Sequence, residues 1–335
     1  MADRVLQLAL VGCGGIAGAY LQALHGLAGT RLVAAVDTDP ARRTLCGPDV
    51  APFATVEELL MARAAGLTVD AALVLTPPVS HEALAVQLMA AGIHVLCEKP
   101  LAVSGEAARR MVAASRQHGR VLMMGSKFRY TPDMLRARQL LDEGAIGTLL
   151  LYENVFCSKV DMTRRWNSDP AMAGGGVLVD NGSHSVDIAR YLMGPIRRVA
   201  AQFGRKVQPI PVEDTARLLF ESANGAVGSV DLSWSLTKEV PSYVRLYGDK
   251  GTLEVGWKSS RLKREGEREW TPFGSGYDKV GAFRAQLEDF AAVVTDRRTP
   301  RIGATDAIAS VLVVEAAYRS ARDHCWQDVD VDGTA

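Results

Sequence analysis

Residues 5–17 read VLQLALVGCGGIA, an apolar run that passes directly into a glycine-rich turn. Val5 to Val11 has the length and aliphatic composition of a buried strand, and Ile16 to Leu27 has a helical pattern. Gly12, Gly14 and Ala17 stand between them in G-x-G-x-x-A spacing. The first glycine permits a tight turn, the second lets a pyrophosphate approach the backbone, and the alanine lets helix and strand pack closely.

A glycine pattern in this position predicts a dinucleotide site, because the following helix presents free N–H donors and the positive end of its dipole. A tight βα turn without a ligand is the alternative. We favour the dinucleotide because the pattern opens a βαβ unit. The residues that we expect to hold the cofactor in this turn are Gly12, Cys13, Gly14, Gly15, Ile16 and Ala17.

The acid after the second predicted strand indicates which cofactor is bound. A carboxylate at Asp37 accepts hydrogen bonds from the adenosine ribose and repels a 2′-phosphate, and Thr38 supplies no cation. We therefore expect Asp37 and Thr38 to bind NAD rather than NADP. Asp37 acting only as a turn residue before Pro40 is the alternative, and Arg42 and Arg43 just beyond keep NADP open.

Short apolar segments alternate with helical ones through the first third of the chain. The expected strands are 31–36, 71–75, 95–97 and 121–124, and the expected helices are 56–63, 81–91 and 105–118. Such alternation predicts βαβ units with right-handed crossovers and a parallel sheet. The fold class is α/β, with a doubly wound Rossmann domain over residues 1–125.

The pattern changes after residue 125, and we expect an α+β domain for substrate binding and oligomerisation over residues 126–335. Expected helices are 132–143, 180–192, 281–295 and 305–322; extended segments are 147–156, 215–222, 226–235 and 242–248. Asn224-Gly225 predicts a type I′ hairpin. The strands alternate so that one face of a large, open, mainly antiparallel sheet is apolar, and helices or another subunit must cover it.

Composition excludes several classes of protein. Among 335 residues, 38 Lys and Arg balance 38 Asp and Glu, so we expect neither nucleic acid nor a membrane as partner. The five cysteines are scattered without zinc spacing, which predicts reduced thiols and no metal site. Met1–Arg4 leads into the first strand without a signal-peptide pattern, and we expect a cytoplasmic protein.

Two sets of residues could carry chemistry. Lys99, in Cys97-Glu98-Lys99-Pro100, follows a parallel strand and so lies at the ligand-binding edge of the sheet; surface decoration is the alternative. Asp180 and His184 are four residues apart, so a helix places them on one face. The carboxylate could then orient an imidazole that acts as a general base. A helix-start aspartate and a core histidine are the alternative.

Several motifs together resemble the glucose-fructose oxidoreductase / inositol dehydrogenase / MocA family. They are the GCGGIA turn, Thr76-Pro77-Pro78 with His81, Glu98-Lys99-Pro100, Phe128-Arg129-Tyr130 with Pro132, and the GGG-x-x-x-D-x-G-x-H run from Gly174 to His184. The resemblance extends from Val5 to about Arg322. It implies a Rossmann domain, an α+β domain with an open sheet, bound NAD or NADP, and a homodimer or homotetramer formed through that sheet.

The resemblance also implies roles for individual residues. Lys99, Asp180 and His184 match the family's catalytic lysine, aspartate and histidine, and the cofactor site gains Thr76, Pro77, His81, Glu98 and Lys99. In the oxidation of a secondary alcohol, His184 accepts the proton, Lys99 stabilises the charge on the oxygen, and Asp180 positions the substrate or the imidazole. The division of work between lysine and histidine stays open.

The substrate-binding residues that we expect are Lys99, Arg129, Trp166, Asp180, Asn181 and His184. Basic residues at 127, 129, 159, 164 and 165 suit a phosphorylated or nucleotide-linked sugar, whereas acids at 153, 161 and 169 suit an amino sugar. The motifs Ser126–Tyr130 and Asp180–His184 are similar to those of dehydrogenases in aminoglycoside biosynthesis. A reductase of a keto-sugar, imine or dihydrodiol, and a non-catalytic NAD-binding regulator, are the alternatives.

Overall fold

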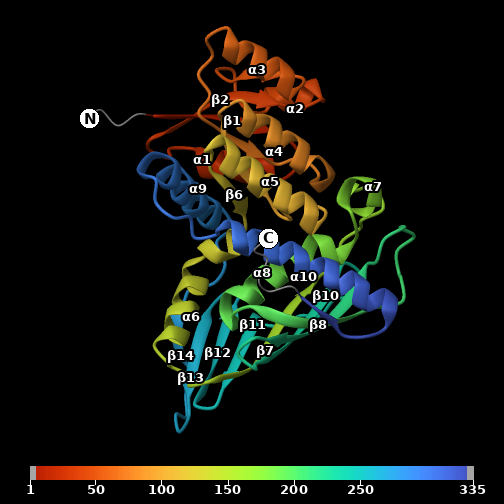
Figure 1. Ribbon diagram of the computed structural model, residues 1–335. Helices are drawn as coiled ribbons and strands as arrows, with labels where there is room; N and C mark the ends of the chain where they lie inside the picture. The colour runs from red at the N-terminus through yellow and green to blue at the C-terminus, as the bar shows by residue number, and fades with distance from the viewer. Residues whose placement is uncertain (1–4, 330–335) are drawn as a thin grey trace. The chain divides into compact units, whose positions relative to one another are not determined.

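A computed structural model describes residues 5–329 (Figure 1), so Met1–Arg4, on which the expectation about a signal peptide rests, lies outside the described residues. The chain divides into two compact units. The first comprises Met1–Lys127 and Lys279–Ile308, and the second comprises Phe128–Asp278 and Ala309–Ala335. The division expected after residue 125 differs from this one, because the segment 279–308 belongs to the first unit.

The first unit is a doubly wound α/β domain. Its elements are β1 (Leu6–Val11), α1 (Ala17–Leu24), β2 (Thr30–Val36), α2 (Pro40–Thr44), β3 (Ala51–Phe53), α3 (Val56–Ala64), β4 (Ala71–Val74), the 3-10 helix η1 (Pro78–Ser80), α4 (His81–Ala90), β5 (His94–Glu98), α5 (Gly105–His118), β6 (Leu122–Gly125) and α9 (Lys279–Asp296). The six strands are parallel, in the order β3-β2-β1-β4-β5-β6. The predicted Rossmann fold is confirmed, with its switch point between β1 and β4.

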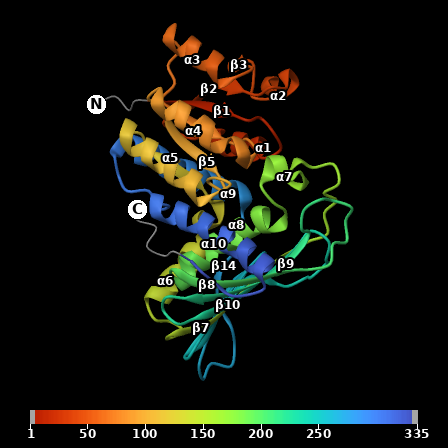
Figure 2. The ribbon, with the colours of Figure 1, turned by 45° about the vertical axis from the view of Figure 1, so that its right-hand side comes forward.

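Helices cover both faces of this sheet. Helices α4 and α5 pack together on one face, and α9 packs against α1 on the other (Figure 2). The rings of Tyr20 in α1 and Phe283 in α9 lie 4.5 Å apart and are both fully buried. This apolar contact explains why a segment from late in the chain belongs to the first unit.

The second unit is an α+β domain built on a large sheet. Its elements are η2 (Lys127–Tyr130), α6 (Pro132–Asp142), β7 (Leu149–Cys157), η3 (Trp166–Ser168), α7 (Pro170–Ala173), α8 (Val177–Met193), β8 (Ile196–Phe203), β9 (Thr215–Ser222), β10 (Val227–Ser233), β11 (Ser242–Gly248), β12 (Gly251–Gly256), β13 (Ser260–Arg264), β14 (Thr271–Gly274), the part of α10 (Ala304–Asp323) from Ala309 on, and β15 (Gln327–Asp328). The sheet order is β14-β13-β12-β11-β7-β10-β9-β8-β15. Strands β7 and β10 are parallel, and the other neighbours are antiparallel.

One face of the nine-stranded sheet is covered by helices, as its alternation predicts. Helix α8 packs on β7, β9 and β10, and α6 packs on β12 and β14. Leu218 and Phe220 of β9 are buried beneath this layer, whereas Leu219 between them is 45% exposed. Leu151 and Val227 are similarly exposed, at 49% and 47%. The second face of the sheet therefore carries apolar side chains that no helix within residues 5–329 covers.

The hairpin between β9 and β10 forms as predicted, but the prediction of a type I′ turn is wrong. A type I′ turn needs positive φ at both central residues, and of the two only Gly225 has it, at 85°. Ser222 N–H donates to the carbonyl of Ala226, and Gly225 N–H donates to the carbonyl of Ser222. The turn is thus a three-residue loop, in which glycine alone takes the left-handed conformation.

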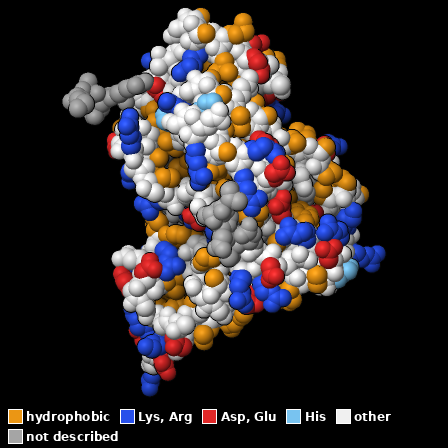
Figure 3. Space-filling model, in the orientation of Figure 1, with side chains coloured by type: hydrophobic (Ala, Val, Ile, Leu, Met, Phe, Trp, Pro, Cys, Tyr) orange, Lys and Arg blue, Asp and Glu red, His pale blue; other side chains and the backbone are white. Residues whose placement is uncertain are grey.

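Charged side chains of both signs are interspersed over the face of the molecule seen in Figure 3, as the balanced composition predicts. Among residues 5–329, no helix combines the length and the apolar character that a membrane span requires.

Candidate active site

Four loops of the first unit leave the sheet at the same edge. Val11 of β1 pairs with Val36 of β2 and with Val74 of β4, and Val74 pairs with Cys97 of β5. Because all of these strands are parallel, the residues that follow them come together at the carboxyl edge. The loops there carry the glycine turn, Asp37, Thr76 and Lys99, so the structure brings most of the expected cofactor residues to one place.

The glycine turn after β1 has two kinds of glycine. Gly12 has a φ of 91°, and a Cβ there would lie 2.9 Å from backbone atoms of Leu75 and Thr76. Packing within the protein thus requires Gly12. A Cβ at Gly14 or Gly15 would meet no protein atom within 4 Å. Glycine at these two positions keeps open a space that a pyrophosphate could approach, and the residues fit NAD.

The start of α1 also fits an anion. Ile16 at the N-cap makes no side-chain hydrogen bond to the first turn, whereas Asp39 and Ser104 cap α2 and α5 in that way. Ala17 is 2% exposed, which agrees with the close packing of helix and strand expected from an alanine there. The first turn of α1 can therefore direct its N–H groups and its dipole at a phosphate.

Asp37 is held in place by the backbone of the same edge. One carboxylate oxygen accepts from Cys13 N–H at 2.7 Å and the other accepts from Asp39 N–H at 2.9 Å. The carboxylate is thereby fixed at the end of β2, beside the glycine turn. A negative charge in this position suits the ribose hydroxyls of NAD and disfavours a 2′-phosphate.

His81 joins the loops that follow β4 and β5. It is fully buried, with Nδ1 at 2.9 Å from the carbonyl oxygen of Pro100 and Nε2 at 2.8 Å from that of Thr76. Burial lowers the pKa of His81. We therefore assign His81 to positioning the loops after β4 and β5. The Lys99–Pro100 peptide bond in the second of these loops is cis.

A buried network fixes the backbone of Lys99. One carboxylate oxygen of Glu98 accepts from the hydroxyl of Tyr20 at 2.6 Å, and the other accepts from Lys99 N–H at 3.1 Å. Gln286 Nε2 in turn donates to the Tyr20 hydroxyl at 2.9 Å. Glu98 is thus directed toward α1 and α9, and it acts on the site by orienting Lys99. The network draws on α9, which the sequence did not associate with the first unit.

In the second unit, α8 carries the other predicted catalytic pair. Asp180 lies in its first turn and His184 one turn later, on the same face, as their spacing predicts. His184 is 9% exposed and lies edge-on to the ring of Phe128, with 5.1 Å between ring centroids. Asp180 is half-buried. A carboxylate next to a largely desolvated imidazole is a suitable arrangement for a general base.

The glycines before α8 serve a contact within the protein. Glu213 is 9% exposed, and one of its carboxylate oxygens accepts from Gly176 N–H at 3.0 Å, Leu178 N–H at 3.0 Å and the Tyr318 hydroxyl at 2.7 Å. A Cβ at Gly176 would overlap Glu213, and one at Gly175 would overlap the Tyr318 hydroxyl. Desolvation raises the pKa of Glu213. This carboxylate clamps the N-terminus of the helix that bears Asp180 and His184.

Sequence reasoning missed Glu213 and Tyr318. Both lie far along the chain from the GGG run, and neither belongs to a recognisable motif. The only available signal was the run itself, because consecutive glycines before a helix indicate that other groups approach the backbone closely.

An aromatic cluster adjoins His184 and was also missed. Its five rings are Phe128, Phe156, Tyr243, Trp257 and Tyr277. Phe128 stacks on Tyr277 at 5.0 Å, and Trp257 lies 4.6 Å from Tyr243, measured between ring centroids. Trp257 is 40% exposed. Phe128, Phe156 and Tyr243 are buried, so the cluster runs through the interior from the imidazole and reaches solvent at the indole of Trp257.

Arg129, expected to bind substrate, is part of a buried ion pair. It is 4% exposed and forms a bidentate pair with Asp187, at 2.9 and 2.7 Å. Its guanidinium also lies over the ring of Tyr191. A buried guanidinium engaged in this way holds η2 against α8, and a contact of Arg129 with substrate stays a prediction.

The remaining expected substrate residues lie on separate elements of the second unit. Asn181 donates from Nδ2 to the carbonyl of Phe156 at 3.3 Å and so fixes the end of β7 against α8. Trp166 is 42% exposed in η3. Asn181 therefore has a structural contact of its own, whereas the exposed indole of Trp166 stays a candidate.

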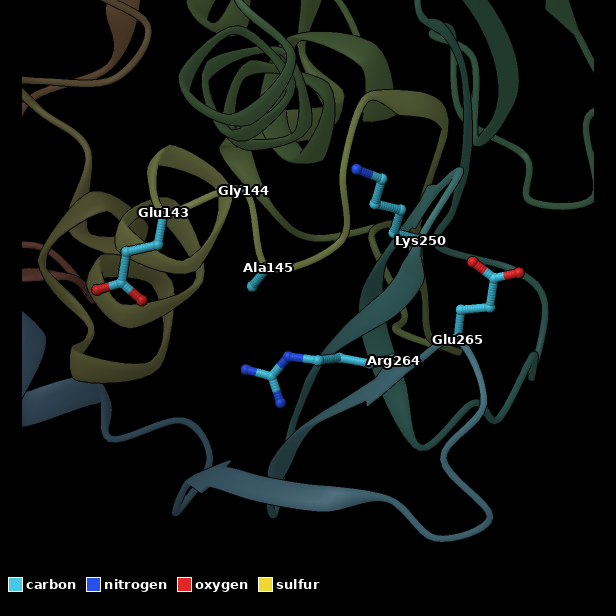
Figure 4. Close-up of a pocket in the computed structure, with 6 residues that line it drawn as sticks. All are labelled: Glu143, Gly144, Ala145, Lys250, Arg264 and Glu265. Carbon is cyan, nitrogen blue, oxygen red and sulfur yellow. The ribbon is translucent and has the colours of Figure 1, made fainter.

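A hollow of about 500 Å³ elsewhere in the second unit does not have the character of an active site. It is lined by Glu143, Gly144, Ala145, Lys250, Arg264 and Glu265. In Figure 4 the charged side chains point in different directions and do not converge on a common point. An enzyme site needs such convergence.

The chain matches two protein-family models over most of its length. Residues 6–126 match the model described as "Oxidoreductase family, NAD-binding Rossmann fold". Residues 134–254 match the "GFO/IDH/MocA C-terminal domain". The first match covers the glycine turn, Asp37 and Lys99, and the second covers Asp180, His184 and Glu213.

Three similar proteins illustrate these matches. D-apiose dehydrogenase of Paraburkholderia graminis is 29% identical over 334 residues, covering 94% of this chain and 87% of the relative. Inositol 2-dehydrogenase 2 of Saccharopolyspora erythraea is 27% identical over 330 residues, covering 94% and 93%. The crystal structure of GenD2 from gentamicin A biosynthesis in complex with NAD is 30% identical, with a TM-score of 0.85 and coverage of 98% and 97%.

Proposed function

Because this chain belongs to the Gfo/Idh/MocA family and is an NAD-dependent oxidoreductase acting on CH–OH groups, we propose that it oxidises one secondary hydroxyl of an aminoglycoside or related amino sugar to a ketone. The family assignment supports a sugar or cyclitol substrate. The narrower proposal follows from the aromatic cluster and from the likeness to GenD2.

Three side chains carry the proposed reaction. NAD, when bound, takes up the hydride from the alcohol carbon at its nicotinamide ring. His184 accepts the hydroxyl proton, and Lys99 donates a hydrogen bond to the reacting oxygen and neutralises its developing negative charge. Asp180 orients the imidazole of His184 or a neighbouring substrate hydroxyl.

The placement of Asp180 and His184 is the observation that supports this proposal most directly. Both project from one face of α8, and the start of that helix is held by Glu213. Lys99 follows β5 at the carboxyl edge of the other unit, with its backbone N–H bound to Glu98. Catalysis requires both sets to act on one substrate, which makes their convergence part of the proposal.

The substrate proposal rests on two observations. GenD2, the solved structure at 30% identity, comes from gentamicin A biosynthesis, and gentamicin is an aminoglycoside. The mostly buried aromatic cluster beside His184 reaches solvent at Trp257, whose indole is 40% exposed. Sugar and cyclitol rings present C–H groups on one face and hydroxyls at the edge, so the exposed indole could stack on such a ring.

Two substitutions test the catalytic roles. Lys99→Met and His184→Ala are each expected to lower kcat by about 10²- to 10⁴-fold, the usual contribution of acid–base groups, and NAD affinity should change little in His184→Ala. Lys250→Met, in the hollow of Figure 4, and His25→Ala on the surface are matched controls and should keep normal turnover. Normal kcat in either catalytic variant would contradict its assignment.

A substrate panel tests the narrower claim. Reduction of NAD should be fastest with an aminoglycoside or amino sugar and slower with myo-inositol, D-apiose and nucleotide-linked sugars. Trp257→Ala should raise KM for the preferred substrate with little change in kcat, because the indole contributes binding and no chemistry. Equal rates across the panel would leave the dehydrogenase assignment intact and contradict the aminoglycoside proposal. NAD binding without turnover of any polyol would favour a non-catalytic regulator.

We propose further that the open face of the nine-stranded sheet binds a second copy of the chain. Leu151, Leu219 and Val227 are each 45% exposed or more on this face, and burying them would stabilise a dimer or tetramer. Light scattering on the purified protein should give a mass of two or four chains. The cytoplasm, where NAD and reduced thiols coexist, is the proposed compartment.

A further inference from the structure

Two cysteines from separate segments meet beside the glycine turn. Cys13 stands between Gly12 and Gly14, and Cys46 follows α2. Their sulfur atoms are 3.7 Å apart, and both are free thiols. Both residues belong to the first unit. This thiol pair is therefore a feature of the region that the glycine turn and Asp37 assign to the cofactor.

The two thiols differ in accessibility and in ionisation. Cys13 is 5% exposed, whereas Cys46 is partly exposed. The hydrogen bond between the sulfurs lowers the pKa of Cys46, while the same hydrogen bond and burial raise the pKa of Cys13. The thiolate, not the thiol, is the nucleophile in sulfur chemistry. An oxidant would therefore react first with the sulfur of Cys46. The sulfur of Cys13 lies next to it and could react with the oxidised Cys46 in a second step.

We propose that Cys13 and Cys46 are a modification site, at which a hydroperoxide oxidises them to a reversible disulfide that weakens NAD binding. The Cys46 thiolate attacks one peroxide oxygen, the O–O bond breaks, and Cys46 sulfenic acid and one water are formed from hydrogen peroxide. The Cys13 sulfur then attacks the sulfenic sulfur, an S–S bond forms, and the second water leaves. The thiols lose two electrons and the peroxide gains them.

Contacts of Cys13 connect this chemistry to the cofactor. An S–S bond is about 2 Å long, so the sulfurs must move closer than 3.7 Å. Cys13 N–H donates to Asp37 at 2.7 Å, and its sulfur lies 3.7 Å from the carbonyl oxygen of Val36. Moving Cys13 therefore disturbs both the turn beside Gly14 and the carboxylate proposed to bind the ribose. This step rests on the assignment of the turn as the cofactor site.

The other cysteines serve as internal comparisons. Cys97 is fully buried in β5, with its sulfur 3.9 Å from the carbonyl oxygen of Leu101. Cys157, near the carbonyl of Asp231, and the exposed Cys325 belong to the second unit. Within residues 5–329, Cys13 and Cys46 are the one cysteine pair whose sulfur atoms lie within hydrogen-bonding distance of each other.

The experiment uses the full-length protein, treated with graded hydrogen peroxide and then digested without reduction. The expected product is a peptide pair joined between Cys13 and Cys46, with a loss of two hydrogens in the intact mass. The Kd for NAD, measured by calorimetry, should rise about tenfold, as for the loss of one strong hydrogen bond. Dithiothreitol should restore it.

A reciprocal measurement separates coupling from general damage. If the disulfide weakens NAD binding tenfold, saturating NAD must favour the dithiol by the same factor. The midpoint potential of the pair, titrated in glutathione buffers, should then rise by about 30 mV when NAD is present. A potential that is unchanged by NAD would overturn the proposed coupling.

Variants identify the sulfurs. Cys46→Ser should bind NAD normally and lose the response to peroxide, whereas Cys325→Ser should bind NAD normally and keep the response. Absence of the Cys13–Cys46 peptide, at peroxide doses that modify Cys325 in the same sample, would overturn the proposal. Failure of the reduced protein to bind NAD would instead contradict the cofactor site, while peptide mapping would still report whether the disulfide forms.

Discussion

The N-termini of α1 and α8 look alike in the sequence and are used in opposite ways. Each helix follows a run of glycines, and neither has a side-chain N-cap of its own. At α8 the space before the helix is filled by Glu213, which accepts from Gly176 N–H and Leu178 N–H. At α1 a Cβ on Gly14 or Gly15 would meet no protein atom within 4 Å.

The difference shows what glycine does in each turn. Before α8, glycine admits a carboxyl group and a tyrosine of the same chain, so the hydrogen-bond acceptor at the helix N-terminus is part of the fold. Before α1, packing requires Gly12 alone, and the next two glycines leave room for an anion from outside. A helix N-terminus presents free N–H donors in both cases. One site stabilises the helix that bears His184, and the other is suited to NAD.

The largest expected effect comes from filling the turn before α8. Gly176→Val places atoms where the backbone carbonyl of Glu213 lies, and we expect a loss of about 3 kcal/mol in the free energy of unfolding, at the upper end for overpacking. Urea unfolding followed by circular dichroism measures it. A variant as stable as the unmodified protein would show that the two turns do not differ in this way.

The matching substitution before α1 should act on binding instead. Gly14→Val adds a side chain that meets no protein atom at its Cβ, so the free energy of unfolding should change by less than about 1 kcal/mol. The Kd for NAD should rise about a hundredfold, equivalent to about 2.7 kcal/mol, because the side chain occupies the approach to the backbone. Calorimetric titration with NAD measures this loss. Unchanged affinity would show that the turn is not the pyrophosphate site.

A smaller effect is expected from the charge beside the α1 turn. Asp37→Asn keeps an oxygen that can accept from Cys13 N–H but removes the negative charge. The preference for NAD over NADP should fall about tenfold, or about 1.4 kcal/mol, since repulsion of a 2′-phosphate is lost. Initial rates with each cofactor give the ratio. Asp39→Asn, which removes a neighbouring charge at the cap of α2, is the control and should change the ratio less.

The smallest effect, and the one with a distinctive pH dependence, concerns the carboxylate at α8. Desolvation raises the folded-state pKa of Glu213 above its ordinary 4.5, so its protonated form favours folding. The contribution of protonated Glu213 to the free energy of unfolding is fully present below about pH 4.5. It is lost as the pH rises through the folded-state pKa. Glu213→Gln stays neutral and keeps an acceptor, so its stability should differ from the unmodified protein by less than about 1 kcal/mol at low pH.

Unfolding measured across pH 4 to 8 checks this prediction. The stability of the glutamine variant relative to the unmodified protein should increase with pH over that window. A constant difference between the two proteins would mean that burial does not shift the titration of Glu213. Because Tyr318 and two backbone N–H groups stabilise the charged form, a decreasing difference would mean that these hydrogen bonds outweigh desolvation.

Periodicity and turn chemistry were enough to predict much of the fold. The helices at 105–118 and 132–143 and the strands at 215–222 and 242–248 are local patterns that the structure reproduces to within a residue, and the parallel Rossmann sheet is confirmed. Strands β3, β8 and β12 to β15 were not predicted. Their segments are short or rich in charge, and they become strands because a neighbouring strand satisfies their backbone hydrogen bonds.

Groups that touch through space were harder to predict than groups in motifs. Asp180 and His184 needed only a helical spacing, and Gly12 needed only its position after a strand. Glu213, Tyr318 and the contact of Cys13 with Cys46 each join residues at least 30 apart in the chain. A single sequence carries no record of such contacts, since no periodic pattern relates the partners.

The sequence alone determined the two kinds of domain and the glycine-rich turn after the first strand, because these follow from local spacing of apolar residues and glycines. The tertiary structure alone decided that Arg129 belongs to a buried pair with Asp187, that α9 packs on α1, and that Glu213 holds the start of α8. Burial and close approach decide such outcomes, and both arise only when distant segments pack together.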